Sequence, residues 1–537
     1  MREKHSGIAD KHFIVKAYSG ATVEEDKRPY VAVCARHGRG PVTRVFLPAS
    51  SATDASKVMS ALLDAGLEFN DPLLTKRAVV NALKGVSSQP VRVAVRSGWH
   101  EKRFVYDGSV FGRNDKPYLF VHQDLTHRAG PVSPAPNDEL VEYLGKIGRQ
   151  SDFVVCATLI AFAQPLLGML PSPERAVIYI WGESRTGKTT LATLINALSR
   201  PPSDRVLFSF DATDRAFEEM LQRCSDNVAV FDELTVIQDS EIERRLLPFI
   251  YMAANGRGKS RSKGASFPNL RWRTTTVVTG EKNLSALRAK CVGSGQDARF
   301  LVFPVPARSS GGIWTTRMSR KKREKNIQKL DRLCDAYCGY SYRDWLLHLA
   351  VNYDSVKASF EENVEKYTTA LAGEEADGVS RARARKYAQI IAAGDELIKY
   401  GTLEWDESLP LEAIQRLYEA DILPTVSDAD ALDKTRTPAI EILAHIGRGA
   451  IPFHEGDEES EGRSAYRCKW IGEEFVMIKR DHLSEFISGS PREVANAFKA
   501  ARASKWSGTS PFFQYGKARE RYLRVSLVQL NRLAERP

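Results

Sequence analysis

The middle of the chain alternates short apolar runs with longer amphipathic segments. The apolar runs are rich in β-branched and aromatic residues, as buried strands are, and cover residues 177–181, 206–210, 227–231, 272–278 and 300–305. Segments with helical apolar spacing separate them, including residues 213–224 and 239–255. Strands and helices in alternation are what a parallel sheet requires. The pattern therefore predicts an α/β fold with a parallel-sheet core over residues 136–310.

The residues before this core carry shorter runs bounded by glycine, proline or aspartate. Five of these runs predict strands, at residues 12–17, 30–35, 44–47, 91–95 and 103–106. Two segments with helical apolar spacing lie among them, at residues 55–65 and 73–85. We expect an N-terminal mixed α/β module over residues 1–135, with a proline-rich linker at residues 127–138.

Helical spacing dominates the residues after the core. Residues 330–353 and 387–399 predict helices of a region that spans residues 311–400, with a polar segment between them. The basic run at residues 317–325 is expected to be a solvated face, with a DNA contact as the alternative.

The last part of the chain, residues 401–537, has a different pattern. It predicts two helices, a strand pair, a basic helix and a final strand, at residues 411–419, 430–445, 465–470 with 474–478, 491–503 and 522–527. That order suggests a helical, winged-helix-like C-terminal domain.

One uncharged apolar run, residues 153–173, is long enough to be compared with a membrane span. Gln164, Pro165 and Gly168 interrupt it, and it leads directly into the first core strand. We therefore expect a buried helix that packs on the core, and no membrane association.

The composition limits the cellular compartment and the kind of binding partner that we expect. The net charge of +10 over 537 residues favours an anionic partner, with nucleic acid first and a merely basic surface as the alternative. The 7 cysteines are scattered and form no Cys-x-x-Cys pair, which argues against a disulfide or zinc scaffold. The N-terminus lacks the apolar stretch of a secretory signal, so we expect a cytoplasmic protein.

Candidate chemistry begins at the end of the first core strand. Residues 182–189, GESRTGKT, fit the phosphate-loop pattern G-x-x-x-x-G-K-[ST] at every fixed position. In such a loop, backbone N–H groups bind phosphate oxygens, the lysine pairs with the β- and γ-phosphates and the hydroxyl ligates Mg²⁺. ATP and Mg²⁺ are therefore the predicted cofactors, with Thr189 as a metal ligand. The predicted nucleotide contacts are Gly182, Glu183, Ser184, Arg185, Thr186, Gly187, Lys188, Thr189 and Thr190.

Asp232 and Glu233 follow the apolar run at residues 227–231. A carboxylate at the C-terminal end of a strand lies at the sheet edge where phosphate loops are found. Asp232 is therefore predicted to hold Mg²⁺, and Glu233 to orient or deprotonate a water molecule. The alternative is that the pair caps a helix N-terminus.

A glycine- and serine-rich basic loop, residues 255–264, follows the predicted helix at residues 239–255. Its cations are Arg257, Lys259, Arg261 and Lys263. Mobile cations suit the recognition of phosphates, so these residues are predicted to contact nucleic acid. A solvated surface loop is an equally good interpretation.

The order of these features resembles an AAA+ ATPase module: phosphate loop, Asp-Glu strand, strand with a polar tip, helix, and an arginine before the last strand. The segments WGESRTGKTT, FDEL, NGRGKSR, RWRTTTVVTGEKNL and GQDARF, with RSGWHEKRFVYDGSVFG and AFAQPLL upstream, narrow the resemblance. They look like the family catalogued as domain of unknown function 927, found in bacteria and phages. Its members resemble the replicative helicases of mobile elements. The similarity covers roughly residues 90–400.

The resemblance implies roles beyond the two motifs. Arg299 would be the arginine finger that completes a neighbouring subunit's site, which implies a ring of identical chains, a hexamer. Thr279 would be a catalytic residue at the tip of the sensor strand, where many AAA+ modules have asparagine, and Glu281 and Asn283 fit that role less well. The helices of residues 311–400 would form a lid over the nucleotide.

Together these features predict a Mg²⁺-dependent ATPase that acts on nucleic acid. The predicted function is that of a DNA helicase or translocase of a mobile element or phage, which acts on single-stranded or forked DNA. Its expected partners are replication or defence proteins. One alternative is an AAA+ remodelling or phage-defence ATPase that binds DNA or protein without unwinding. A P-loop kinase is a further alternative, which the Asp-Glu pair disfavours. A primase–helicase fusion is set aside, because no metal-binding carboxylate cluster is evident in residues 1–135.

Overall fold

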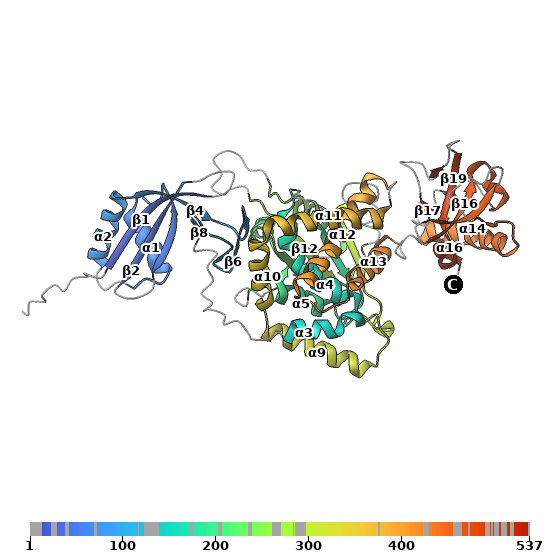
Figure 1. Ribbon diagram of the computed structural model, residues 1–537, viewed down its shortest axis with the longest axis horizontal. Helices are drawn as coiled ribbons and strands as arrows, with labels where there is room; N and C mark the ends of the chain where they lie inside the picture. The colour runs from blue at the N-terminus through green and yellow to red at the C-terminus, as the bar shows by residue number, and fades with distance from the viewer. Residues whose placement is uncertain are drawn as a thin grey trace, which may run out of the picture.

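The computed structural model has three bodies arranged along its long axis (Figure 1). A β-rich N-terminal body, a large central α/β body and a smaller C-terminal body follow one another in chain order. The structure describes residues 13–22, 29–37, 42–68, 72–115, 118–122, 139–171, 175–201, 207–234, 239–259, 270–282, 284, 297–373, 376–422, 429–454, 464–470, 473–488, 494–495, 498, 504–505, 513–515 and 520–534.

A five-stranded parallel sheet is the centre of the central body. Its strands are β9 (Val177–Trp181), β10 (Phe208–Ser209), β11 (Val228–Asp232), β12 (Thr275–Gly280) and β13 (Phe300–Pro304). They lie in the order β10-β11-β12-β9-β13, and each neighbouring pair is parallel. The predicted parallel core is confirmed. One strand, β12, separates the strand before the phosphate loop from the strand that carries the acidic pair.

Successive residues of these strands face opposite layers of helices. Ile178 and Val230 belong to one hydrophobic core, and Tyr179 and Phe231 belong to the other. The second layer holds α6 (Asp214–Arg223) and α7 (Asp239–Asn255). The first layer holds α3 (Glu139–Ile147), α4 (Asp152–Met169), α5 (Lys188–Ser199), α9 (Arg320–Ala336), α10 (Tyr340–Val351), α11 (Tyr353–Ala372), α12 (Gly378–Tyr400) and α13 (Ser408–Ile422).

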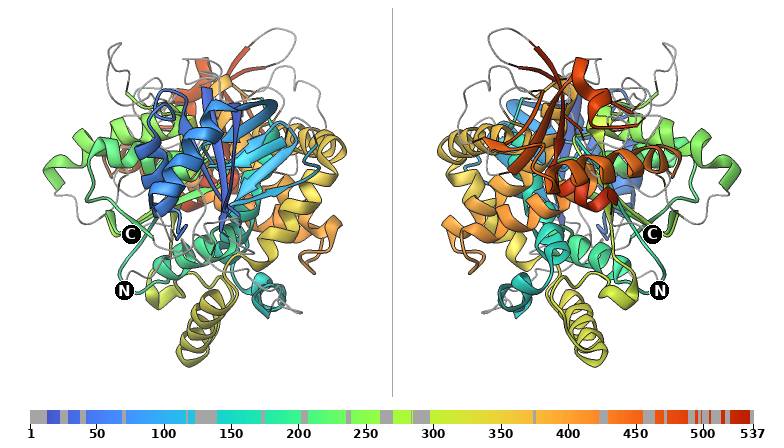
Figure 2. Two further views of the ribbon diagram at one scale, coloured as in Figure 1. Left: turned by 90° about the vertical axis from the view of Figure 1, so that its left-hand side faces the viewer. Right: turned by 90° about the vertical axis from the view of Figure 1, so that its right-hand side faces the viewer.

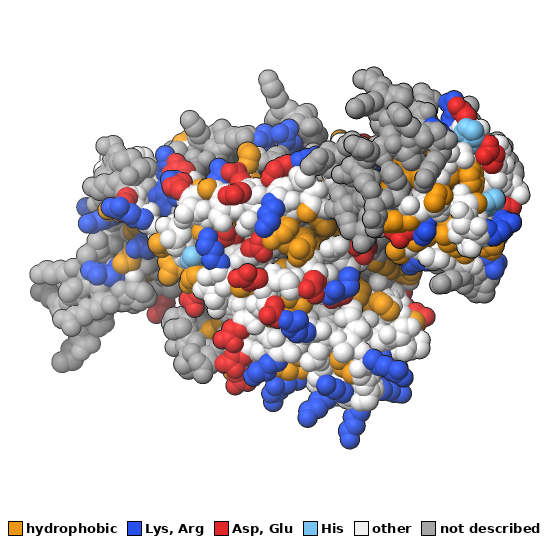
Figure 3. Space-filling view, turned by 45° about the vertical axis from the view of Figure 1, so that its right-hand side comes forward, with side chains coloured by type: hydrophobic (Ala, Val, Ile, Leu, Met, Phe, Trp, Pro, Cys, Tyr) orange, Lys and Arg blue, Asp and Glu red, His pale blue; other side chains and the backbone are white. Residues whose placement is uncertain are grey.

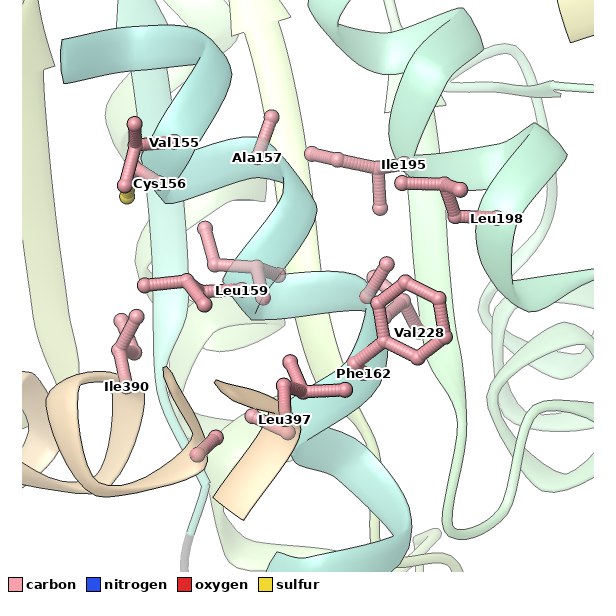
Figure 4. Close-up of a cluster of buried hydrophobic side chains, with 14 of the residues drawn as sticks. Val155, Cys156, Ala157, Leu159, Phe162, Ile195, Leu198, Val228, Ile390 and Leu397 are labelled. Carbon is pink, nitrogen blue, oxygen red and sulfur yellow. The ribbon is translucent and has the colours of Figure 1, made fainter. Parts of the chain in front are cut away.

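Helix α4 is the apolar run that the sequence compares with a membrane span. Among the described residues it is the one helix long and apolar enough to cross a membrane, and all of its 18 residues are buried inside the structure. Its side chains interlock with those of α5 and α12: Leu159 and Phe162 lie among Ile195, Ile390 and Leu397 (Figure 4). The expected buried helix is therefore present.

The helical region after β13 differs in detail from its prediction. α11 was not predicted, and α12 begins at Gly378, inside the polar segment between the two predicted helices. Its arginines and alanines are good helix formers, and Ala384 and Tyr387 are buried. α13 packs in the same core as α4, so we draw the C-terminal body from Ala429 rather than from residue 401.

The N-terminal body is a curved sheet covered on one face by α1 (Ala55–Asp64) and α2 (Pro72–Lys84). The sheet has the order β3-β2-β1-β4-β8. Its strands are β1 (Phe13–Thr22), β2 (Pro29–His37), β3 (Thr43–Pro48), β4 (Ser87–Ala94) and β8 (Tyr118–Val121). All four predicted strands and both predicted helices of this sheet region are confirmed, whereas β8 was missed. The predicted linker at residues 127–138 lies outside the described residues.

A three-stranded sheet joins the N-terminal body to the central body. It consists of β5 (Gly98–His100), β6 (Arg103–Tyr106) and β7 (Ser109–Phe111). Trp99 lies in the central core, donates from Nε1 to the carbonyl of Pro165 at 2.7 Å, and donates from its backbone N–H to the buried carboxylate of Asp226 at 2.9 Å. Arg273 donates to the same carboxylate at 2.6 Å. We call these contacts of Asp226 the Asp226 joint.

The C-terminal body has its own hydrophobic core. α14 (Ala429–Gly447) and α16 (Leu527–Ala534) pack with a six-stranded sheet of β14 (Phe453–His454), β15 (Ala465–Trp470), β16 (Glu473–Lys479), β17 (Ser504–Lys505), β18 (Phe513–Tyr515) and β19 (Glu520–Ser526). The predicted strand pair, β15 and β16, is antiparallel as expected. The sheet holds more strands than the sequence predicts, and the basic helix predicted at residues 491–503 lies mostly outside the described residues. The winged-helix interpretation stays a prediction.

Candidate functional site

The phosphate-loop sequence joins the C-terminal end of β9 to the N-terminus of α5. Gly187 precedes the helix with φ 103°, and Arg185 has φ 60°. A non-glycine residue with positive φ is uncommon and concentrates at functional sites. The loop therefore has the tight, glycine-dependent turn that brings backbone N–H groups and a helix N-terminus to one place.

Lys188 reaches back across this loop. Its ammonium donates to the carbonyls of Gly182 at 2.8 Å and Glu183 at 2.6 Å. Burial lowers the pKa of Lys188 below its usual value, and nearby carboxylates oppose that shift. Those carboxylates belong to Glu281, Asp232 and Glu233. The lysine is thus held in the loop with the acidic residues facing it.

The segment after β13 supports the loop from behind. The N–H of Ile313 donates to the carbonyl of Thr186 at 3.0 Å, and a Cβ on Gly187 would lie 2.8 Å from the Ile313 side chain. A Cβ on Gly182 would lie 2.8 Å from the carbonyl of Val305. Glycine is therefore required at both ends of the loop by close packing. The sequence did not predict this support, and the pair Gly311-Gly312 was its one visible signal.

Thr279 holds the acidic pair in place. Its hydroxyl donates a short hydrogen bond to the carboxylate of Asp232 and accepts one from the backbone N–H of Glu233 at 3.2 Å. Glu233 has φ 63°, so this backbone bond holds a residue in a sparsely populated conformation. Thr279 itself is 1% exposed, and it aligns with Ile180 near the end of β9. The predicted sensor residue thus lies between the phosphate loop and the acidic pair.

Glu281 is a member of this site that sequence reasoning ranked low. Its carboxylate lies 4.0 Å from the Lys188 ammonium. It directly follows Thr279-Gly280 at the end of the central strand, and that position was the available signal. Asn283 lies outside the described residues.

The donor set fits ATP and Mg²⁺. Glu183, Ser184, Arg185 and Thr189 are exposed, so the outer side of the loop and the Thr189 hydroxyl are open to a ligand. Carboxylate and hydroxyl oxygens are the ligands that Mg²⁺ prefers, and Asp232 and Thr189 supply both kinds. Thr190 differs, because it is buried and its side chain is hydrogen-bonded to Asp331 of α9.

Arg299 lies at the opposite edge of the sheet from the phosphate loop. It ends a short 3₁₀ helix directly before Phe300, which pairs with Val177 at the start of β9, whereas the loop follows Trp181 at the end. Four residue steps of strand separate the two edges, about 13 Å at the usual rise. The guanidinium lies 5.9 Å from the ring centroid of the exposed Tyr251 on α7. Arg299 cannot therefore serve the loop of its own chain.

The basic loop emerges from a short hairpin stem between α7 and β12. Gly258 donates to the carbonyl of Leu270 and Trp272 to that of Gly256, each at 3.0 Å, and Arg257 pairs with Arg271 as an antiparallel bridge. The ammonium of Lys259 pairs with Asp214, and its backbone N–H donates to the buried Glu218 carboxylate at 2.8 Å. Arg257 and Lys259 are exposed. Arg261 and Lys263 lie outside the described residues.

Comparison with known proteins gives a family and a fold. No curated protein matches the sequence. A solved structure described as "SCCmec type IV Cch - active helicase" is similar to the chain with a TM-score of 0.56 and 14% identity, over 97% of this chain and 94% of that one. At this identity the similarity concerns the fold alone, and it extends over all three bodies.

The family match covers a different span from the resemblance noted in the sequence. It begins in β1, well before residue 90, and includes the Asp226 joint, the phosphate loop and the acidic pair. It ends before Thr279 and Arg299. Residues 18–266 of this chain thus match the model of the family described as domain of unknown function 927 (DUF927).

Proposed function

We propose that this chain is a Mg²⁺-dependent ATPase of the AAA+ kind that drives movement on nucleic acid, in particular a DNA helicase or translocase of a mobile element or phage. The observation that carries the proposal is that Thr279 is hydrogen-bonded to both Asp232 and Glu233, beside Lys188. A structural ion pair would not need a strained glutamate backbone and a buried hydroxyl that aims two acids at a phosphate loop. The helicase-like fold supports the choice of motor.

In this mechanism the loop N–H groups and Lys188 bind the triphosphate of ATP. Thr189 and Asp232 would hold Mg²⁺, which supplies positive charge for the phosphate oxygens. Glu233 orients the attacking water and accepts its proton. Thr279 keeps Asp232 and Glu233 in their directions, so that neither needs to reorganise during the reaction.

Arg299 would act on a neighbouring subunit. Because it lies across the sheet from its own loop, its guanidinium can neutralise transition-state charge only at the loop of another chain. An arginine finger is worth about a thousandfold or more in rate, so hydrolysis should depend on assembly. A ring of identical chains, with six as the expected number, satisfies this geometry for every subunit.

The basic loop and its stem, which we call the basic hairpin, would contact the nucleic acid. Its stem ends at Trp272, three residues before β12 begins at Thr275, and β12 contains Thr279. A change at the nucleotide site therefore has a short path to the loop. The cations of the hairpin, Arg257 and Lys259 with Arg261 and Lys263, would bind phosphates of a single strand.

The test is ATP turnover of the purified protein with and without single-stranded and forked DNA, with particle size measured in parallel. Turnover that DNA stimulates, together with ring formation in ATP, would support the proposal and lead to a strand-displacement assay. Turnover that is indifferent to DNA would contradict a nucleic-acid motor and favour a remodelling or defence ATPase. Lys188→Ala is the control for contaminating activity, since it removes the phosphate contact.

A further inference from the structure

A second basic surface lies on α9, outside the hairpin and the nucleotide site. α9 runs along the lower edge of the central body (Figures 1 and 2), and Lys and Arg side chains gather at that edge (Figure 3). Glu324 is the one acid among residues 317–330. The exposed cations are Arg317, Arg320, Lys321, Lys322, Lys325, Lys329 and Arg332.

The positive charge of this surface is largely uncompensated. Glu324 is shared between Arg320 at 2.8 Å and Arg308 at 3.4 Å. Lys321, Lys322 and Lys325 have no ion pair among the residues that the structure describes. We call these three side chains, with Lys329, the α9 basic stripe.

The position of the stripe is unfavourable for the helix itself. Ser319 caps α9 by accepting a hydrogen bond from the N–H of Lys322 at 3.3 Å, and no acid lies in the first turn. The N-terminal end of a helix is its positive end, so acids stabilise it and cations destabilise it. Cations in this place therefore weaken α9, and an anionic partner would offset that cost.

The inner face of α9 is anchored on the phosphate-loop helix. Leu330, Leu333 and Cys334 are buried in the core that contains α5. The carboxylate of Asp331 is hydrogen-bonded to the side chain of Thr190, two residues after Lys188. The C-terminal half of α9 is thus in direct contact with the first turn of α5.

A second connection reaches the loop from its other side. The guanidinium of Arg323 donates to the carbonyl of Arg308 at 2.9 Å. Arg308 begins the short segment that ends at Ile313, whose N–H donates to Thr186 within the phosphate loop. A displacement of α9 would therefore act on the loop at Thr186 and at Thr190.

We propose that the α9 basic stripe binds the phosphate backbone of nucleic acid, at a site separate from the hairpin, and that the contacts of α9 with Thr186 and Thr190 make this binding change the rate of ATP hydrolysis. The second half rests on the proposed ATPase function. The first half stands on the charges alone.

The shape of the stripe suits a polymer better than a small anion. Lys321, Lys325 and Lys329 are spaced four residues apart on one helix face, so the row is about 12 Å long. That length equals three to four nucleotides of one strand, at about 3.4 Å each. A small anion would need converging donors, whereas a convex row of lysines offers separate contacts to successive phosphates.

The test compares two variants that lose the same charge. The first is Lys321→Gln, Lys322→Gln and Lys325→Gln. The control is Lys357→Gln, Lys366→Gln and Lys399→Gln, on α11 and α12 of the same helical layer. Glutamine keeps helix propensity, and removing cations from the start of α9 should leave the melting temperature unchanged or raise it.

The binding readout is fluorescence anisotropy of labelled single-stranded and duplex DNA, over a range of salt concentrations and without nucleotide. We expect the α9 variant to bind single strands at least roughly tenfold more weakly, with a salt slope smaller by about 2, since each lost contact removes about 0.7. The control should bind as the wild type does. Equal DNA affinity and equal salt slope for both variants would overturn the site. If the three lysines are needed for binding an acidic protein and not for binding DNA, the stripe is the site of a protein partner and the proposal is overturned.

The coupling readout is ATP turnover as a function of DNA concentration, with Asp331→Ala as a second variant. Asp331→Ala removes the acceptor for Thr190 and keeps the stripe, so it should bind DNA normally and lose most of the DNA-dependent change in turnover. An unaltered DNA response in both the α9 variant and Asp331→Ala would overturn the coupling. If the wild type shows no turnover at all, the proposed function fails, whereas the anisotropy comparison still decides the binding site.

Discussion

Thr279→Val is the most direct test of the proposed nucleotide site. Valine has nearly the same shape, so the buried position stays filled, and two hydrogen bonds disappear. The bond to a carboxylate is worth about 1.5–3 kcal/mol and the bond from the Glu233 N–H about 1 kcal/mol. If this loss of about 2.5–4 kcal/mol is expressed in the transition state, kcat falls roughly 50- to 1,000-fold. KM for ATP should change little, because Lys188 and the loop N–H groups remain.

The assay is steady-state ATP turnover, with binding of a fluorescent ATP analogue and circular dichroism as checks. Thr276→Val is the matched control: Thr276 lies on the same strand, is 0% exposed, and its hydroxyl has no hydrogen-bond partner in the described structure. It should be close to neutral, and Thr279→Ser should keep most activity. A Thr279→Val protein with wild-type kcat would refute the reasoning, because the acids would then not depend on this hydroxyl.

Three further predictions concern other parts of the molecule. Arg299→Ala should bind ATP normally and lose turnover by about a thousandfold. Mixing it with Lys188→Ala should recover activity, because some interfaces then join an intact arginine to an intact loop. Unchanged turnover of Arg299→Ala would exclude the finger role. Asp226→Ala leaves Arg273 without its buried partner and should lower the free energy of unfolding by about 3 kcal/mol or more in urea titrations, whereas an unshifted transition would show that the joint carries little. Burial lowers the pKa of His100 to about 3. Below about pH 6.5 the unfolded chain therefore binds one proton more at this residue than the folded chain does, so the free energy of unfolding falls as the pH drops. From pH 6.5 to 5 the loss should be up to about 2 kcal/mol, and a His100→Gln protein that keeps the full pH dependence would contradict this assignment.

The parts of the site that follow from the sequence are those carried by short local patterns. The phosphate loop occupies eight consecutive residues with fixed glycines, and its strand and helix neighbours are visible as an apolar run and an amphipathic segment. Asp232 and Thr279 could be placed because each ends such a run. In a parallel sheet, strand ends meet at one edge whatever the order of the strands.

The parts that could not be predicted depend on contacts between distant segments. Nothing near Gly98 or Trp99 in the sequence indicates that they pack on Asp226. The support of the loop by Ile313 depends on where the chain returns after β13. The start of α12 could not be predicted for another reason. Arg383 is buried in an ion pair with Asp421, whereas an arginine in the sequence pattern is interpreted as an exposed position.

The Asp226 joint has a mechanical consequence. Strand β11 begins two residues after Asp226 and ends at Asp232, so the joint and the acidic pair are the two ends of one strand, roughly 20 Å apart at the usual rise. β12 pairs with this strand from Val228 to Phe231, and β10 pairs with its last two residues, Phe231 and Asp232. A displacement of Trp99 would thus act on the acidic pair through this one strand. A partner that binds the N-terminal body would therefore be able to change the positions of Asp232 and Glu233.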